Sequence, residues 1–449
     1  MSITKKEKTT RIYRESIYRP REIDATWEKT STPRTDIPWE NDFPWDEEYE
    51  IEEFDWINNM DWENDAPWDN KRKKSKVAII PCYSYDQDEV DAAVRKGISE
   101  IGGARQFIKK DERILFKPNL LTRAAQNKAV TTHPSVFEAV VRHFKEEGYE
   151  NLSYGDSPGH PGNIKKTAEV CGISQVAERL DLPMADFATG STVEYVSGRL
   201  VRKYEICKGV LESDAIVNIC KMKTHQLETI TGAVKNMFGC VHGLSKSASH
   251  AKFPDAHSFA QMLIELNLIL QPRLHIMDGV IAMEGNGPSS GSPRYMNVLL
   301  FSDDPVAMDA TFCRLIDLNV KMVPTVYYGE KLYLGNMYEQ DIDIVGITNF
   351  DDYVRKDFDV VRDGQDESLK WKLIKHLKWI SRRPVIDKNK CVKCGVCVKT
   401  CPLDDKAVDF PGGRKDRYPE YDYKKCIRCY CCQEMCPEGA ITTKLRFGR

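Results

Sequence analysis

Two runs of cysteines near the C-terminus have the spacing of iron–sulfur ligands. The first run consists of Cys391, Cys394, Cys397 and Cys401, followed by Pro402. The second run repeats these spacings with Cys426, Cys429, Cys432, Cys436 and Pro437. In such a C-x2-C-x2-C-x3-C-P run, three thiolates on one tight loop hold a [4Fe–4S] cluster, and the fourth reaches across to the other cluster. The sequence therefore predicts two [4Fe–4S] clusters.

The predicted ligand sets are crossed between the two runs, as in two-cluster bacterial ferredoxins. Cluster 1 is assigned to Cys391, Cys394, Cys397 and Cys436. Cluster 2 is assigned to Cys426, Cys429, Cys432 and Cys401. Zinc is the alternative, because paired C-x2-C motifs also build zinc sites. Two complete runs that each end in Cys-Pro favour the clusters, and with them electron transfer.

A ninth cysteine, Cys431, fits neither run. If it replaced Cys432 as a ligand, one gap would shorten to a single residue and the loop would be distorted. We interpret Cys431 as a spare thiol beside cluster 2. A redox role of its own would depend on its exposure and its thiolate character.

Further polar residues follow predicted strands in the middle of the chain. They lie in the segments 117–119, 155–159, 221–225 and 303–305, and a glycine-rich segment at 284–288 follows another strand. Because ligands bind at the carboxyl ends of strands in open parallel sheets, we expect these segments to share a cleft. Asp-Ser-Pro-Gly at 156–159 is also a common turn sequence, so each segment alone is weak evidence.

The residue types in this cleft favour an anionic ligand. Positive charge comes from Lys117, Lys221, Lys223 and Lys235, and the glycine loops expose backbone N–H groups, so a phosphate or carboxylate fits. His225 is expected to exchange a proton near neutral pH. Asp156 and Glu284 are candidate acids, bases or metal ligands. The predicted catalytic set is Lys117, Asp156, Lys223, His225 and Glu284.

The elements that must position these residues alternate along the chain. Apolar strand candidates cover residues 77–81, 113–117, 152–156, 215–220, 276–278 and 298–301, and helical spacing covers 88–108 and 134–144. This alternation predicts an α/β domain over residues 76–365, with a mostly parallel sheet and flanking helices. A charged helix around residues 369–380 then joins it to the ferredoxin domain, and together they span residues 366–449.

Residues 1–75 form an irregular N-terminal arm in this division. Residues 38–70 contain thirteen Asp or Glu, no Lys or Arg, and five tryptophans. The composition predicts either a solvated arm or an arm whose tryptophans dock on a basic surface. The nearest complement is residues 370–449, with twenty Lys or Arg against nine Asp or Glu. Nucleic-acid binding is disfavoured, because these basic residues are interleaved with the cluster loops and form no continuous basic surface with aromatic side chains.

The remaining cysteines and the hydropathy indicate the compartment. A length of 449 residues allows two or three domains. The sequence has no secretory segment and no apolar run of transmembrane length. We therefore expect no disulfides, and we expect the protein in the cytoplasm. Because oxygen degrades such clusters, we expect an anaerobic or low-oxygen host. The scattered cysteines, without pairing spacings, are Cys82, Cys171, Cys207, Cys220, Cys240 and Cys313.

Taken together, the motifs resemble the iron–sulfur family built on domain of unknown function 362. The resemblance covers residues 77–449 and implies an α/β domain joined to a two-cluster ferredoxin tail. It implies no reaction, and the acidic arm has no counterpart in it. The motifs that carry it lie at residues 117–119, 132–134, 155–159, 221–225, 233–236, 278–279, 284–285, 304–307 and 426–437.

Two functions of different classes follow. The first is a cytoplasmic iron–sulfur oxidoreductase that passes electrons from two [4Fe–4S] clusters to a small anionic substrate or a cofactor in the α/β cleft. The alternative is a non-catalytic electron-transfer protein that docks a redox partner protein. A cluster-dependent scaffold is a third, weaker reading. A pocket of small-molecule size near a cluster would favour the enzyme, and a flat surface would favour the carrier.

Overall fold

The structure is a computed structural model that describes residues 73–159, 164–195, 198–243, 245–362 and 382–445. The predicted N-terminal arm, apart from residues 73–75, lies outside these described residues. The predicted charged helix at residues 369–380 also lies outside them. No helix in the described ranges is long and apolar enough to cross a membrane.

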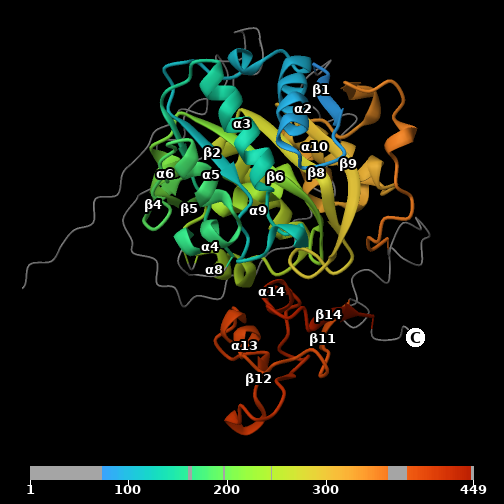
Figure 1. The fold of residues 1–449 in the computed structure, drawn as a ribbon. Coiled ribbons are helices and arrows are strands. Elements are labelled where there is room, and N and C mark those ends of the chain that lie inside the picture. Colours follow the sequence, from blue (N-terminus) through green and yellow to red (C-terminus); the bar gives the residue numbers. More distant parts are fainter. Residues whose placement is uncertain (1–72, 160–163, 196–197, 244, 363–381, 446–449) are drawn as a thin grey trace, which may run out of the picture. The chain divides into compact units, whose positions relative to one another are not determined.

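A mixed sheet, eight-stranded within the described residues, forms the centre of the α/β domain (Figure 1). Strand β9 runs antiparallel to both of its neighbours, β1 and β8, and β7 is antiparallel to β6. The other pairs are parallel, so the predicted α/β fold with a mostly parallel sheet is confirmed. In spatial order the strands are β10 (Ile342–Val345), β1 (Ser75–Pro81), β9 (Ser292–Ser302), β8 (Leu274–Glu284), β6 (Ala215–His225), β2 (Ile114–Pro118) and β3 (Leu152–Tyr154), with β7 (Thr229–Thr231) beside β6.

Helices cover the sheet on both faces. Figure 1 shows α2 (Gln87–Glu100) and α3 (Pro134–Glu146) side by side across one face. Their apolar residues, among them Val94 and Val140, share a core with Phe116 and Val217 of the sheet. Because side chains alternate along a strand, Leu115 and Ile216 face the opposite side, where α10 (Pro305–Leu315) packs on β1, β8 and β9.

The remaining helices and the small hairpin complete the α/β domain. The predicted helix at 88–108 stops at residue 100, because Gly102 and Gly103 take positive φ angles of 114° and 85°. The other elements are α4 (Ile164–Val170), α5 (Ile173–Arg179), β4 (Gly190–Glu194), β5 (Lys203–Cys207), α6 (Lys208–Leu211), α7 (Ala233–Asn236), α8 (Ser245–Lys252), α9 (Ala256–Leu270) and α11 (Pro324–Lys331).

The direction of β9 corrects one expectation. Because β9 runs antiparallel, residues 303–305 at its carboxyl end lie at the opposite edge of the sheet from the carboxyl ends of β2, β3 and β6. Asp304 instead caps α10 by accepting hydrogen bonds from the N–H groups of Val306 (2.8 Å) and Ala307 (2.9 Å). The expectation that this segment joins the cleft is therefore wrong.

The ferredoxin domain is built from two short antiparallel pairs and two short helices. Both cysteine runs have left-handed residues at matching positions: Lys393 and Arg428 have φ of 59° and 62°, and Gly395 and Tyr430 have φ of 75° and 59°. The two loops therefore curl in the same way around their cysteines. The elements are β11 (Arg383–Ile386) with β14 (Ile441–Lys444), β12 (Val408–Asp409) with β13 (Glu420–Tyr421), α13 (Val396–Thr400) and α14 (Cys431–Glu434).

Candidate functional site

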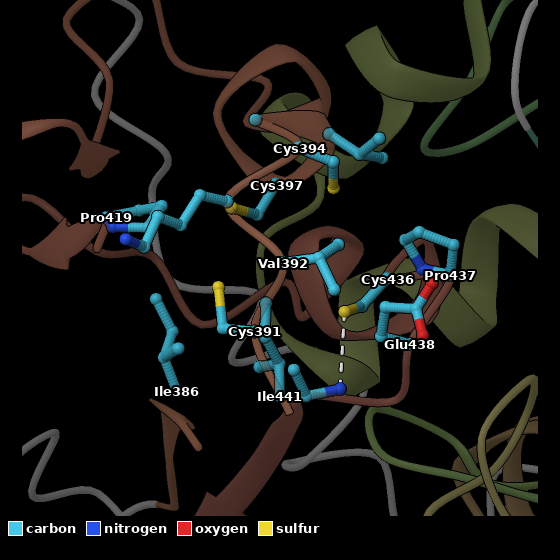
Figure 2. Close-up of a pocket in the computed structure, with 14 residues that line it drawn as sticks. Ile386, Cys391, Val392, Cys394, Cys397, Pro419, Cys436, Pro437, Glu438 and Ile441 are labelled. Atoms are coloured by element: carbon cyan, nitrogen blue, oxygen red, sulfur yellow. Dashed lines mark hydrogen bonds between the residues drawn. The ribbon is translucent and has the colours of Figure 1, made fainter. Parts of the chain in front are cut away.

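Four cysteines from the two runs surround one small pocket. Figure 2 shows Cys391, Cys394 and Cys397 of the first run facing it together with Cys436 of the second. The Ala440 N–H donates a hydrogen bond to the Cys436 sulfur at 3.3 Å (Figure 2). The grouping is the one assigned to cluster 1, and four thiols around one pocket fit a [4Fe–4S] cluster.

The cysteines assigned to cluster 2 also gather. Cys401 and Cys432 are buried in the small core of the ferredoxin domain. Burial is the main cause of the raised pKa of Cys426, and the nearby Cys429 and Cys401 thiols add to it. The Tyr421 hydroxyl donates to the Cys432 sulfur at 3.2 Å. This set draws three cysteines from one run and one from the other, which fits a second cluster with crossed ligands.

Cys431 begins the short helix α14 and is buried. A hydrogen bond between the Cys431 and Cys429 side chains is the main reason why the pKa of Cys429 is lowered. Cys431 also lines the large cavity described next. The structure thus places the spare thiol between a predicted cluster ligand and the cleft.

A cavity of 270 Å³ lies at the carboxyl ends of β2, β3 and β6. Asn119, Asp156 and Lys223 line it from the α/β domain. Cys431, Glu434 and Met435 of the second cysteine run line it from the ferredoxin domain. The predicted cleft is thus a cavity of small-molecule size, and residues next to the cluster 2 cysteines form part of its wall.

Hydrogen bonds hold the ferredoxin domain against this edge of the sheet. The buried Gln433 side chain in α14 donates to the carbonyl oxygens of Asn286 and Gly287, each at 3.1 Å. The Asn286 amide in turn donates to the Ile441 carbonyl at 3.0 Å. The glycine-rich segment at 284–288 therefore serves as a contact for the tail and supplies only Pro288 to the cavity wall.

Lys117 and Asp156 form a buried ion pair. Their Nζ and Oδ1 atoms are 2.8 Å apart, and the side chains are 0% and 3% exposed. The other Asp156 oxygen accepts from the Leu120 N–H at 2.7 Å. At Gly239 a Cβ atom would come within 1.9 Å of Asp156 Oδ1, so only glycine fits there. Asp156 therefore lines the cleft, and Lys117 lies behind it and neutralises its charge.

Lys223 lies in the same wall without a carboxylate partner. Its Nζ donates to Asn119 Oδ1 at 2.9 Å and to the Val130 carbonyl at 2.7 Å. Burial, assisted by the positive charge of Lys235, lowers the pKa of Lys223 to about 7. This amino group can therefore gain or lose a proton near neutral pH.

A chain of asparagines fixes the wall beside Lys223. Asn119 donates from Nδ2 to Asn236 Oδ1 at 2.9 Å, and Asn236 donates to Asn218 Oδ1 at 2.7 Å. Asn218 in turn donates to the Ala233 carbonyl at 2.9 Å. These bonds join β2, β6 and the short helix α7, which also carries Lys235. The lysine ends are thereby anchored to the sheet.

Two cavity residues on one helix were missed by the sequence reasoning, as were Lys399 and Glu434 in the ferredoxin domain. Lys246 and His250 lie on α8, four residues apart, and both line the cavity. Lys246 donates to the carbonyl oxygens of Ser157 and Pro158, and burial lowers its pKa to about 8. Burial lowers the pKa of His250 to about 3. The i, i+4 spacing of a lysine and a histidine on one short helix was the signal that could have found them.

His225 is close to the cavity but does not line it. Its Nδ1 accepts from the N–H groups of Leu227 (3.0 Å) and Glu228 (3.1 Å), and its Nε2 is 3.6 Å from Glu434 Oε2. Burial, followed by the charge of Lys235, lowers its pKa to about 4. The imidazole is therefore neutral at pH 7 and fixes the turn after β6, in contrast to the expected titration near neutrality.

Two other predicted residues have partners of their own. Lys221 is bonded to Asp278 at 2.7 Å and to the Tyr85 hydroxyl at 2.9 Å, and does not line the cavity. Glu284 accepts from the Asp359 N–H at 3.0 Å, 4.0 Å from Arg294. In the described ranges, no three His, Cys, Asp or Glu side chains are grouped closely enough for a single metal ion. The structure thus joins Lys117, Asp156 and Lys223, but not Glu284.

Comparison with known proteins identifies both parts of the chain. Residues 114–314 match the model of a domain of unknown function, DUF362, and residues 385–440 match a 4Fe-4S dicluster domain. A thylakoid-associated protein of Synechocystis sp. is 33% identical over 260 residues, which cover 58% of this chain and 80% of that protein. The dicluster match supports [4Fe–4S] binding and ferredoxin-type electron transfer, and it disfavours zinc.

Two solved structures are more distantly similar. The lactate racemase apoprotein of Thermoanaerobacterium thermosaccharolyticum gives a TM-score of 0.38 at 11% identity, over 55% of this chain and 57% of that one. A structural-genomics protein of Thermotoga maritima gives 0.33 at 11% identity, over 55% and 59%. The chain thus spans less than two thirds of either. The sequence motifs, the two family matches and the cyanobacterial relative agree that this chain belongs to the DUF362 family and carries a C-terminal 4Fe-4S dicluster domain.

Proposed function

We propose that the protein is an iron–sulfur oxidoreductase whose substrate binds in the lysine-lined cavity. One observation carries the proposal: a cavity of 270 Å³ shares its wall between the α/β domain and the second cysteine run. When bound, two [4Fe–4S] clusters would supply electrons one at a time. Cys426, Cys429, Cys432 and Cys401 would hold the cluster next to this cavity, and Cys391, Cys394, Cys397 and Cys436 the other.

The cavity residues divide the work of binding and proton transfer. Lys235 attracts an anionic substrate, because no hydrogen bond or ion pair within the described residues holds its ammonium. Lys117 and Asp156 hold the β2 and β3 ends together as a neutral pair. Lys223, with a pKa of about 7, is the proton donor we propose in place of His225. The wall of α14 shields this transfer from water.

An external redox protein would deliver electrons at the other cysteine pocket. Cys394 is exposed there, and Val392 beside it is 61% exposed. Lys390 and Lys393 flank these residues on the same loop, so an acidic partner surface fits. Electrons would then enter at this exposed loop, residues 390–394, and leave at the cavity.

A reoxidation assay tests the proposal. The holoprotein is purified and reduced under anaerobic conditions, then mixed with a protein-free small-molecule extract of the host, and cluster reoxidation is followed by visible absorbance. We expect reoxidation by the extract, and we expect Lys235→Met to slow it by about tenfold or more. Reaction with a small viologen dye, which needs no binding site, should stay unchanged. Equal reoxidation of both proteins by the extract would contradict the proposal.

The exposed loop at residues 390–394 also favours the second candidate, an electron carrier that docks a partner enzyme. For a carrier, Lys390→Glu with Lys393→Glu would impair transfer to the partner protein, while Lys235→Met would have no effect on any reaction. An enzyme should respond to both changes, each in its own assay. The pair of variants therefore separates the two functions.

We place this activity in the cytoplasm of a low-oxygen host. In support, no disulfide joins any cysteines within the described residues. The cyanobacterial relative is named for its association with thylakoids. Fractionation of host cells, with the protein in the membrane pellet or in the supernatant, tests the assignment.

A further inference from the structure

We propose that the cavity binds an organic acid: a single carboxylate recognised by Lys223 and Lys235, attached to an apolar, ring-sized body. The inference rests on the proposed function only in treating the cavity as the substrate site, and it names the class of substrate. Three independent features of the wall support it, namely its charge, its apolar surface and an unpaired histidine nitrogen.

The charge of the wall favours an anion. Asp156 is neutralised by Lys117 at 2.8 Å, which leaves Glu434 as the carboxylate without a lysine in contact. Four lysines line the cavity and outweigh it, with a surplus of three positive charges, or of two where Lys223 is neutral; they are Lys223, Lys235, Lys246 and the exposed Lys399. The surplus attracts an anion and balances a carboxylate in either protonation state of Lys223. The apolar part of the wall distinguishes a carboxylate on an organic body from phosphate.

The apolar part of the wall selects against a small inorganic anion. Leu121, Phe238 and Met435 line the cavity together with Pro288. The cavity volume of 270 Å³ exceeds what a lone phosphate or carboxylate would fill. An apolar ligand body that displaces water from these side chains contributes about 25 cal/mol per Å² of apolar surface. An aromatic or branched acid uses both the lysines and this surface.

A buried histidine in the wall has an unpaired ring nitrogen. His250 lines the cavity and is 6% exposed, and its Nδ1 has no hydrogen-bond partner within the described residues. Its ring stacks on Phe259 at 4.4 Å between centroids, so the imidazole is held in place. A buried polar atom without a partner is costly. A carboxylate or hydroxyl group of the ligand would satisfy it.

Anion binding should be accompanied by proton uptake. A ligand carboxylate next to Lys223 would raise its pKa from about 7, so a neutral amine would take up a proton when the acid binds at about pH 8. The charged groups that face Lys223 are Lys235, Glu434, Lys221 and Asp156. Lys221 is paired with Asp278 and Asp156 with Lys117, so Lys223 is the group among these that responds. Lys246, with a pKa of about 8 in the same cavity, adds to the uptake.

Isothermal titration calorimetry of the oxidised holoprotein tests the inference without any electron transfer. The probes are benzoate and cinnamate, with cinnamamide as the neutral analogue and inorganic phosphate as the anion without an apolar body. The titrations are made in HEPES and in Tris at about pH 8, because the difference in buffer ionisation heat reports proton uptake. We expect at least one of the acids to bind about tenfold more tightly than cinnamamide and phosphate.

Three variants assign the effect to residues. Lys235→Met should weaken binding of the acid by about tenfold, and Lys223→Met should reduce the proton uptake to the part that Lys246 supplies. Lys252→Met, on the exposed end of the same helix that carries His250, is the matched control and should change neither. Unchanged cluster absorbance confirms that each variant is folded.

Three outcomes would overturn the inference. They are cinnamamide binding as tightly as the acids, phosphate binding as tightly as the acids, and no binding of either acid. Tight acid binding combined with no reoxidation of the reduced clusters by any small molecule would instead count against the proposed function alone. The two failures are therefore distinguishable.

Discussion

At the scale of single residues, partners decide what each charge can do. Lys117 and Lys221 looked equivalent to Lys223 in the sequence, but each is bonded to a buried carboxylate and so contributes no free charge. Lys223 and Lys235 have no carboxylate in contact with their amino groups. Lys223 donates to amide and carbonyl oxygens, and Lys235 lies over an aromatic ring. Only the fold shows this difference, since the carboxylates come from distant positions in the chain.

The buried pair at the cleft should matter for stability far more than a surface pair. Asp156→Asn would leave the Lys117 ammonium buried without its counter-charge, which costs about 3 to 5 kcal/mol. The matched control is Asp214→Asn, which breaks the exposed pair with Arg113 at 2.8 Å and should cost less than about 1 kcal/mol. Thermal unfolding of both holoproteins measures the difference. Equal losses of unfolding temperature would show that the Lys117 site is not buried.

The low pKa of Lys223 predicts a pH dependence of folding. In the unfolded chain this lysine has a pKa of 10.5, and in the fold about 7. Between these values the unfolded state binds the extra proton, so the free energy of unfolding rises with pH. From about pH 7 to pH 9 the protein should gain on the order of 2 kcal/mol relative to Lys223→Met. Parallel stability curves from urea titrations of the two proteins would contradict the assigned pKa.

At the scale of elements, local patterns predicted most strands and helices but not their directions. The apolar runs at 77–81 and 113–117 became β1 and β2, because their residues are buried on both faces of the sheet. The strand at 215–220 extends to His225, since Lys221 and Lys223 find partners inside the fold. The antiparallel direction of β9 has no local signature. It depends on the hairpin with β8, and it removed Asp304 from the cleft.

The cysteine loops give the sharpest prediction about elements. If the ligands are crossed, Cys401→Ser removes a ligand of the cluster held mainly by the second run. Electron paramagnetic resonance of the reduced variant should then match that of Cys429→Ser, with one signal lost. It should differ from that of Cys394→Ser, which loses the other cluster. A match between the Cys401 and Cys394 variants would show that each run holds its own cluster.

At the scale of the whole molecule, the sequence showed the two kinds of chemistry but not that they meet. The cysteine spacing predicted the clusters, and the strand ends predicted a cleft with Lys117, Asp156 and Lys223. The shared wall could not be read from the sequence, because it depends on packing between residues such as Gln433 and Gly287, 146 positions apart. Lys246 and His250 were missed for a related reason, because α8 does not directly follow a predicted strand.

The acidic arm gives a prediction that rests on its sequence alone. Residues 38–70 combine thirteen acidic residues with five tryptophans and contain no Lys or Arg. We therefore expect them to dock on a basic surface of this chain or of a partner. Limited proteolysis of the holoprotein should then be slow in this segment at low salt and faster at high salt. Rapid cleavage that is indifferent to salt and to partners would favour the solvated arm.

The central claim is that the lysine cavity and the second cysteine run form one redox site. The most direct measurement is a potentiometric titration of both clusters, followed by electron paramagnetic resonance, in the unmodified protein and in Lys235→Met. Loss of a positive charge beside a cluster destabilises its reduced form, so one potential should fall by on the order of tens of millivolts while the other stays unchanged. Lys109→Met, at an exposed position away from the cavity, should move neither. Identical potentials in the unmodified protein and Lys235→Met would contradict the claim.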